Sequence, residues 1–333
     1  ICRRVERILS SKYMKSLSPW NRVYENEVEV MGRVNLNYDI IGVAILDYLD
    51  LYKKFTYTNQ ETYRLDYIAN VELGQKKLDH SEFETFRDFY TQDWQKFVTY
   101  NIHDVELVDR LEDKMKLIDL AVNLAFDAKV NFEDVYSQVR MWDSIIYNYL
   151  TPKNIVVPPN EKEDKSEKYE GAYVKQPVPG GYDWVVSFDL NSLYPHLIMQ
   201  YNISPETLLG HKHPSATVDR ILGKEITVDG EYCVCANGAQ YRKDVRGFLP
   251  ELMEKIYTER VIYKKKMLVA KQEYEKNPSP QLVKDISKFN NIQMARKIQL
   301  NSAYGAIGNQ YFRYYKLANA EAITLSGQVS IRW

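Results

Sequence analysis

The chain has few cysteines, no long apolar run and almost no net charge. Its 333 residues include three cysteines, Cys2, Cys233 and Cys235, too few for a disulfide framework or a four-cysteine zinc site, so we expect reduced thiols. No apolar run approaches the roughly 18–20 residues of a membrane helix, and no signal-peptide pattern is present. The formal net charge is −1, so any surface that binds a polyanion must be local.

Helical and strand-like patterns alternate along the chain, and one charged segment interrupts them. Helical spacing covers residues 65–73 and 93–116, and residues 117–150 continue with apolar stripes typical of helices. Residues 40–50 predict an apolar strand that passes into a helix. Residues 160–168, NEKEDKSEK, contain no apolar side chain, and this composition predicts a solvated linker. The length allows two or three domains.

One apolar segment leads directly to a carboxylate. The apolar residues Val185, Val186 and Phe188 predict a half-buried strand that leads to Asp189. Pro195, with the preceding Tyr194, stops this strand from continuing. A carboxylate at the end of a buried strand is costly unless it is paired, hydrogen-bonded or bound to a metal. For a single aspartate in isolation, capping of the next helix is the more frequent explanation.

Two long helices are predicted in the last third of the chain. Residues 249–276 have continuous helical character, the Pro-containing segment 277–280 interrupts it, and a second helix covers about residues 281–304. Two long helices around a short turn predict an antiparallel helical hairpin. Between residues 251 and 300, eleven Lys or Arg accompany six Asp or Glu, so the excess positive charge of the chain lies on this hairpin.

Six hairpin residues have a spacing that lets them surround one anionic group. They are Arg260 and Lys264 on the first helix, and Lys297, Asn301, Tyr304 and Gly305 on the second. Residues three, four or seven apart share a helix face, and a glycine leaves room for a close approach. Arginine offers phosphate a bidentate fork and lysine a mobile charge. For each residue alone, an ordinary amphipathic stripe remains the alternative.

Two short motifs resemble the nucleotide-site signatures of family B DNA polymerases. DLNSLYP, residues 189–195, is similar to the pattern D-x-x-S-L-Y-P, and KIQLNSAYG, residues 297–305, is similar to K-x-x-x-N-S-x-Y-G. Both match at every fixed position, in the order of the family, with a helical hairpin between them. NISPETL, residues 202–208, and GNQYFRYY, residues 308–315, resemble the T-even phage branch of that family.

Two upstream segments extend the resemblance. YNIHD, residues 100–104, is similar to the third exonuclease motif, Y-x-x-x-D, in which Tyr100 and Asp104 lie one helical turn apart and can converge on a metal-bound water. EGAYV, residues 170–174, resembles the linker motif that tracks the template strand. The resemblance therefore implies DNA contacts from four residues: Tyr169, Gly171, Ala172 and Gly305. The second polymerase carboxylate of the family, in a D-T-D strand, and the first exonuclease motif, D-x-E on an apolar strand, do not occur.

The resemblance also implies an α+β fold. Residues 1–116 would form the C-terminal part of a ribonuclease H-like 3′–5′ exonuclease domain, and residues 117–160 a helical segment that returns to the N-terminal domain. Residues 161–246 and 310–333 would belong to the palm, an antiparallel sheet with helices, and residues 247–309 would be the fingers hairpin. On this basis we expect a piece that begins inside the exonuclease domain and ends inside the palm.

For the polymerase site, the resemblance assigns a role to each motif residue. Asp189 would bridge two Mg²⁺ ions, with the carbonyl group of Leu190 as a further ligand, and Ser192 and Leu193 would donate backbone amides to the triphosphate. Tyr194 would pack under the sugar and exclude a 2′-hydroxyl group. The phosphate-binding cations would be Arg260, Lys264 and Lys297, and Asn301 and Tyr304 would line the nascent base pair.

The implied activity is template-directed incorporation of dNTPs, with a divalent metal held by Asp104 at the exonuclease site. Implied partners are primer–template DNA, dNTPs and, through regions outside this sequence, a sliding clamp and a single-strand-binding protein; no membrane partner is implied. The implied location is the cytoplasm of an infected bacterial host. Because each site lacks a carboxylate, we expect this chain alone to be inactive. The alternatives are an exonuclease, or one subunit of a split polymerase.

Overall fold

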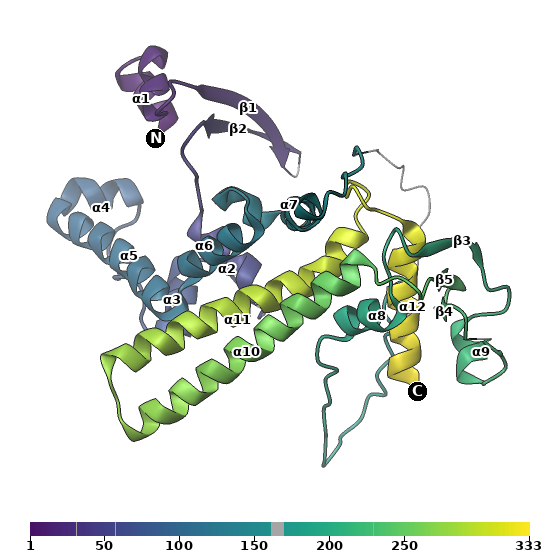
Figure 1. Ribbon diagram of the computed structural model, residues 1–333. Helices are drawn as coiled ribbons and strands as arrows, with labels where there is room; N and C mark the ends of the chain where they lie inside the picture. Colours follow the sequence, from purple (N-terminus) through teal and green to yellow (C-terminus); the bar gives the residue numbers. More distant parts are fainter. Residues whose placement is uncertain (31, 57, 161–169, 229) are drawn as a thin grey trace. The chain divides into compact units, whose positions relative to one another are not determined.

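The computed structural model describes residues 1–30, 32–56, 58–160, 170–228 and 230–333 (Figure 1). The chain divides into two compact units. The first comprises Ile1–Ala121 and Asn131–Tyr136, and the second comprises Val122–Val130 and Ser137–Trp333. The predicted linker, residues 160–168, lies outside the described residues except for Asn160. Across the described residues, no helix is long and apolar enough to cross a membrane.

The first unit combines one antiparallel hairpin with several helices. In chain order these elements are α1 (Cys2–Ile8), the 3-10 helix η1 (Ser11–Leu17), β1 (Val23–Val30), β2 (Arg33–Ile40), α2 (Tyr48–Phe55), α3 (Leu65–Leu73), α4 (Phe86–Gln92), α5 (Trp94–Met115), the start of α6 (Leu117–Ala128) and η2 (Phe132–Tyr136). Buried aliphatic and aromatic side chains from α2, α3, α4 and α5 form its interior.

The predicted helix boundaries of this unit agree with the structure, and one predicted strand does not. Gly74 ends α3 in the left-handed conformation, with φ 68°, and the Asp93 side chain caps α5 by accepting a hydrogen bond from the Lys96 amide. Of the apolar strand and the helix predicted over residues 40–50, the helix is confirmed by α2, and the strand is wrong because β2 ends at Ile40. Gly42 adopts φ +88° directly after β2, a conformation that interrupts a strand, and Asp47 then caps α2.

The second unit contains a small antiparallel sheet and the longest helices. In chain order its elements are the end of α6, α7 (Gln138–Leu150), η3 (Thr151–Lys153), α8 (Leu193–Tyr201), β3 (Leu208–Lys212), α9 (Val218–Leu222), β4 (Cys233–Val234), β5 (Ala239–Tyr241), α10 (Phe248–Lys276), α11 (Pro280–Ile307) and α12 (Leu317–Arg332). The strand order is β3-β5-β4. Helices with small antiparallel sheets confirm the α+β class.

The predicted helical hairpin is confirmed. Helices α10 and α11 lie side by side along their length (Figure 1). Asn277 ends the first helix, and the Ser279 hydroxyl group starts the second by accepting a hydrogen bond of 3.2 Å from the Leu282 amide. Pro280 occupies the first turn of α11, where its missing N–H group costs nothing.

The base of the hairpin is fixed to α8 by the NISPETL segment. Asn202 ends α8 in the left-handed conformation, with φ 57°. Its side-chain amide donates hydrogen bonds to the carbonyl groups of Arg242 (2.7 Å) and Val245 (2.8 Å), and its carbonyl oxygen accepts one from the Gly247 amide (2.9 Å). Because Gly247 directly precedes α10, one buried side chain joins the end of α8 to the start of the hairpin.

The core of this unit collects residues from the two hairpin helices, α7, α8, α12 and the sheet. Two buried polar pairs cross it: the Trp142 indole N–H donates to Ser302 Oγ at 3.1 Å, and the Tyr241 hydroxyl group lies 2.8 Å from Asn319 Oδ1. Paired polar groups of this kind fix one arrangement of the core, since an unpaired one would be costly.

The strand predicted before Asp189 is absent from the structure. Val185 and Phe188 are 81% and 92% exposed, and their backbone is irregular. A strand needs a neighbour to satisfy its N–H and C=O groups, and among the described residues no strand pairs with this segment. Asp189 is consequently exposed rather than held at the end of a buried strand.

Candidate active site

The two motifs that resemble nucleotide-site signatures meet at one cavity of about 400 Å³ in the second unit. Residues 189–195 form one side of it. The other side is formed by Arg260 of α10 and by Lys297, Leu300 and Asn301 of α11. Most of the predicted nucleotide-site residues are therefore brought together, from segments about 70 and 110 residues apart in sequence.

A hydrogen bond joins the two sides of this cavity. Arg260 Nη1 donates to Ser192 Oγ at 3.0 Å, and Ser192 Oγ lies 3.2 Å from Asn191 Oδ1. Arg260 Nε is buried and has no hydrogen-bond partner among the described residues. A buried donor of a cation without a partner is costly, so the cavity presents a guanidinium group with hydrogen-bonding capacity left for an anion.

Ser192 is held in an unusual backbone conformation at the start of α8. Its φ of 54° and ψ of 43° lie in the left-handed region, which is disfavoured for residues with a Cβ atom. The first amides of α8 directly follow this turn and receive no side-chain cap from Ser192, and free amides at a helix N-terminus are suited to binding an anion. The basic side chains of α10 and α11 lie at the same cavity.

The aromatic residues of the two motifs pack against each other. The ring centroids of Tyr194 and Tyr304 are 4.8 Å apart, with an interplanar angle of 54°. Tyr194 also rests on α12, because a Cβ atom added at Gly327 would lie 3.2 Å from its ring. The Tyr194 ring is thus in close contact with Gly327 and with a second tyrosine, Tyr304.

Two predicted residues lie differently from the rest. Lys264 is exposed one helical turn beyond Arg260 and does not line the cavity. At Gly305, an added Cβ atom would overlap the side-chain amide of Gln138. The close approach that the glycine predicts therefore exists, and in this structure it comes from the first residue of α7.

The oxygen ligands at the cavity suit a hard divalent cation only in part. Asp189 is the one carboxylate among the residues that line the cavity, and Leu190 adds a backbone carbonyl group. Among the described residues, no group of three or more His, Cys, Asp or Glu could hold a metal ion. The cavity therefore offers one part of a Mg²⁺ coordination shell and not a complete one.

In the first unit, the structure adds a lysine to the predicted exonuclease pair. Tyr100 and Asp104 lie one turn apart on α5, and Lys77 Nζ is 2.7 Å from Asp104 Oδ2 and 4.7 Å from the centroid of the Tyr100 ring. Burial lowers the pKa of Lys77, but hydrogen bonds and electrostatic attraction from Asp104 and Tyr100 together outweigh burial, so the lysine pKa is raised. Asp104 Oδ1 is buried without a partner among the described residues.

Sequence reasoning missed Lys77 because it lies in the turn after α3, 27 residues before Asp104. The only signal was the Lys-Lys pair at residues 76–77. Tyr100 itself is 8% exposed and packs in an aromatic group with Phe86 and Phe89. Its ring is therefore fixed in place, and its orientation is set by packing as much as by any ligand.

The predicted linker motif is tied to α12. Two buried side chains of that helix hold it: Thr324 Oγ1 donates to the Glu170 carbonyl group at 3.0 Å, and Gln328 Nε2 donates to the Gly171 carbonyl group at 2.8 Å. Ala172 is exposed beside them. Tyr169, the fourth predicted DNA contact, lies outside the described residues.

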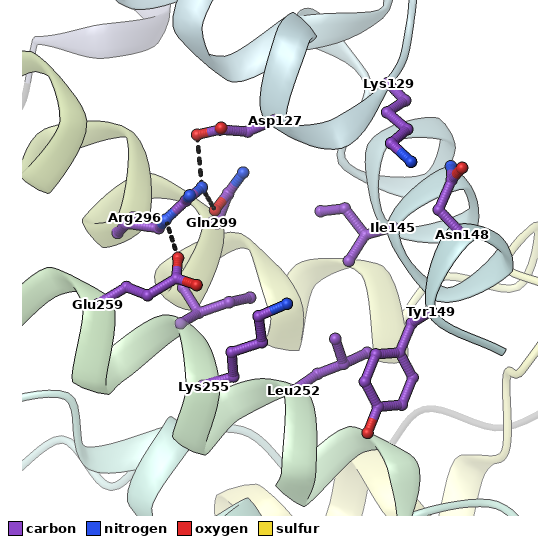
Figure 2. Close-up of a pocket in the computed structure, with 11 residues that line it drawn as sticks. Asp127, Lys129, Ile145, Asn148, Tyr149, Leu252, Lys255, Glu259, Arg296 and Gln299 are labelled. Carbon is purple, nitrogen blue, oxygen red and sulfur yellow. Dashed lines mark hydrogen bonds and ion pairs between the residues drawn. The ribbon is translucent and has the colours of Figure 1, made fainter. Parts of the chain in front are cut away.

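A second cavity of about 210 Å³ lies at the base of the same hairpin and is organised by Arg296 (Figure 2). Arg296 Nε is 2.7 Å from Glu259 Oε2, and Arg296 Nη1 bonds to both Asp127 and Gln299. Burial raises the pKa of the Asp127 carboxyl group, against the opposing effect of Arg296. Glu259 and Arg296 adjoin the cavity residues Arg260 and Lys297 in sequence, so neighbouring residues of each helix serve the two cavities.

Comparisons with known proteins identify the chain. The family model described as DNA polymerase family B matches residues 127–332. The DNA-directed DNA polymerase of Escherichia phage RB69 is 34% identical over 372 residues, covering 99% of this chain, and that of Enterobacteria phage T4 is 34% identical over 374 residues, covering all of it. The chain belongs to the family B DNA polymerases.

This chain covers less than half the length of its phage relatives. It spans 41% of the length of both phage enzymes. Similarity reaches beyond phages: the DNA polymerase delta catalytic subunit of Candida albicans is 29% identical over 81% of this chain and 25% of the relative. Identity to both phage enzymes along nearly the whole chain confirms the predicted T-even-type branch, and the family match includes both motifs of the larger cavity.

Proposed function

We propose that this chain carries the nucleotide-selecting site of a phage DNA-directed DNA polymerase, which adds dNTPs to a primer 3′-hydroxyl group as a template directs. The observation that carries the proposal is the single cavity formed by residues 189–195, Arg260 and Lys297. It combines a helix N-terminus, two cations and one exposed carboxylate, which are the groups a metal-bound triphosphate requires.

In this proposal the triphosphate lies between the two sides of the cavity. Arg260 would exchange its hydrogen bond with Ser192 for a phosphate oxygen, and its buried Nε would gain the partner it lacks. Lys297 would add a second charge, and the backbone amides of Ser192 and Leu193 would bind the same tail. Lys264 would join from its exposed position only if the hairpin moved toward the cavity.

The sugar and base would be selected by packing. The supported ring of Tyr194 forms a fixed surface, and in the family resemblance this residue lies under the sugar, where a 2′-hydroxyl group would clash. Asn301 lines the cavity and Tyr304 lies against Tyr194, in keeping with a surface for the nascent base pair. Gly305, Gly171 and Ala172 are proposed DNA contacts. Specificity would then come from template pairing, with the protein binding backbone and shape.

Asp189 and the Leu190 carbonyl group would hold Mg²⁺ in the whole protein, together with carboxylates from outside these 333 residues. When bound, two such ions lower the pKa of the primer hydroxyl group and offset the charge that develops at the α-phosphate. The chain itself orients the triphosphate and keeps the sugar against Tyr194. No metal-dependent step is assigned to this chain alone, because its ligand set is incomplete.

The first unit supports a proofreading role for the same protein. We place a 3′–5′ exonuclease site at Tyr100 and Asp104, with Lys77 holding one carboxylate oxygen and the other still without a partner. The division into exonuclease (residues 1–116), connecting segment (117–160), palm (161–246 and 310–333) and fingers (247–309) belongs to this proposal. So do a sliding clamp, a single-strand-binding protein and action in the host cytoplasm.

Binding of dATP with Mg²⁺ to the 333-residue chain, measured by equilibrium dialysis, tests the proposed site. Arg260→Gln and Lys297→Gln should each weaken binding about tenfold or more, since each removes one charge-assisted contact. Lys271→Gln removes an exposed charge from the same helix outside the cavity and should leave affinity unchanged. Equal affinity in all three variants would contradict the proposal.

A further inference from the structure

His196, one turn into α8, makes contacts that neither motif accounts for. Its ring Nδ1 is 2.8 Å from the Ser192 carbonyl oxygen, and its backbone N–H donates to the same oxygen at 3.1 Å. Because a carbonyl oxygen only accepts, the ring must carry its proton on Nδ1 to make this bond. One carbonyl group of the Ser192 turn is thus held twice by the same residue.

The His196 ring also contacts the hairpin. The rings of His196 and Tyr257 meet edge to face, with centroids 4.7 Å apart and an interplanar angle of 80°. Tyr257 and Arg260 are three residues apart on α10 and so share a face of that helix. Helix α10 therefore contacts the first turn of α8 at two points. Arg260 bonds to Ser192 Oγ, and Tyr257 packs against the His196 ring.

This double contact coincides with the strained point of the turn. Ser192 adopts its left-handed conformation without the freedom of a glycine, so surrounding bonds must hold it there. Two side chains make these bonds to Ser192: His196 bonds to the Ser192 carbonyl group, and Arg260 bonds to the Ser192 hydroxyl group. If Arg260 leaves Ser192 to bind a triphosphate, the bonds from His196 are the ones of these two side chains that still hold Ser192.

We propose that His196 is a positioning residue for nucleotide binding, an inference that rests on the function proposed above. It does not line the cavity. It acts through Ser192, by keeping the first amides of α8 aimed at the triphosphate when Arg260 leaves, and through Tyr257, by keeping α10 in register with that turn. Its loss weakens dNTP binding without removing any group that touches the nucleotide.

Three substitutions separate the two contacts. His196→Phe keeps a ring against Tyr257 and removes the Nδ1 donor. His196→Asn keeps an N–H donor near the position of Nδ1 and removes the ring, and His196→Ala removes both. Gln200→Ala, an exposed change one turn further along α8, is the matched control. Thermal unfolding of each variant shows whether the second unit still folds.

The measurement is the Kd for dATP with Mg²⁺ in the 333-residue chain. His196→Phe should raise Kd about three- to tenfold, the value of one hydrogen bond, and His196→Ala should raise it further because the ring against Tyr257 is lost as well. His196→Asn should recover the part of the affinity that depends on the hydrogen bond. A residue with only a structural role would instead lower the unfolding temperature in all three variants without this rescue. Gln200→Ala should match the unsubstituted chain.

The possible results separate a failure of the proposed role of His196 from a failure of the proposed nucleotide site. If His196→Ala binds dATP as tightly as the unsubstituted chain while Arg260→Gln does not, the role of His196 is wrong and the nucleotide site stands. If the unsubstituted chain and Arg260→Gln bind dATP equally poorly, the nucleotide site itself is wrong, and the role of His196 is overturned with it.

Discussion

Arg260 Nη1 donates a hydrogen bond of 3.0 Å to Ser192 Oγ, although the two residues are 68 positions apart in the chain. The contact joins the first long hairpin helix to the turn at the start of α8. It also joins the first motif to a cation that lies outside both motifs and lines the same cavity. The predictions below depend on this junction, or on the groups that hold it in place.

The isolated chain should neither extend primers nor degrade single strands at a useful rate. The larger cavity has one carboxylate among its lining residues, and no cluster of three metal-ligating side chains occurs among the described residues. Two-metal phosphoryl transfer needs more ligands than these. A primer-extension assay with Mg²⁺ checks this, and robust synthesis by the purified 333-residue chain would show that the site is complete.

In the full-length protein that contains this chain, Asp189→Ala should abolish polymerisation and leave exonuclease activity intact. Asp104→Ala should do the reverse, because the two carboxylates lie on separate units and, in the function proposed above, would serve separate sites. Asp183→Ala is the control, since this exposed aspartate lies outside the cavity. Primer extension and single-strand degradation are measured on each variant. Normal extension by Asp189→Ala would remove the main catalytic assignment.

Tyr194→Ala in the same protein should relax discrimination between dNTP and rNTP more than it slows dNTP incorporation. In the proposed role, the ring would exclude a 2′-hydroxyl group and would cost nothing when that group is absent. Tyr194→Phe keeps the ring against Tyr304 and should keep the discrimination. If Tyr194 were only a core aromatic, Tyr194→Ala would lower stability and all activities uniformly. An unchanged ratio of dNTP to rNTP efficiency would exclude the proposed role.

Lys297→Ala should weaken dNTP and rNTP use alike, because a cation that binds phosphate does not contact the sugar. Losing one charge-assisted contact costs roughly 1.5–3 kcal/mol, or about a tenfold to hundredfold loss in incorporation efficiency. Incorporation efficiency for matched dNTP and rNTP pairs is the measurement. A loss confined to one sugar type would place Lys297 somewhere other than at the phosphates.

Arg296→Ala should destabilise the second unit by about 2–3 kcal/mol, somewhat less than the cost of breaking a fully buried pair. The change removes the guanidinium group that pairs with the partly buried carboxylates of both Asp127 and Glu259. Arg242→Ala breaks an exposed ion pair with Asp244 and should have no measurable effect. Urea unfolding curves compare the two, and equal midpoints would mean that Arg296 does not anchor the hairpin base.

Much of the helical structure could be predicted because its causes are local. Periodic apolar residues, the cap at Asp93, the left-handed Gly74 and the prolines between α10 and α11 act over a few residues. The irregular backbone at residues 185–188, where the sequence predicts a strand, could not be predicted in the same way. The apolar pattern of this segment indicates which face of a strand could be buried. A strand forms, however, only where a neighbouring strand is present to pair with it.

The site residues, too, fall into those that local spacing predicts and those that only the fold brings together. The spacing of Lys297, Asn301 and Tyr304 indicates one helix face, and the structure places them as that spacing requires. The ion pair between Arg296 and Asp127 joins residues 169 positions apart, and no local pattern connects them. Lys77 and His196 were missed for the same reason, because their roles come from what the fold places beside them.

A crystal structure of this chain with dATP and Mg²⁺ tests most directly whether the two motifs form one nucleotide site. We expect triphosphate density between the start of α8 and α11, with Arg260 moved from Ser192 Oγ to a phosphate oxygen and Lys297 within hydrogen-bonding distance of the same tail. Density for the nucleotide elsewhere, with the hydrogen bond between Arg260 and Ser192 intact, would contradict it.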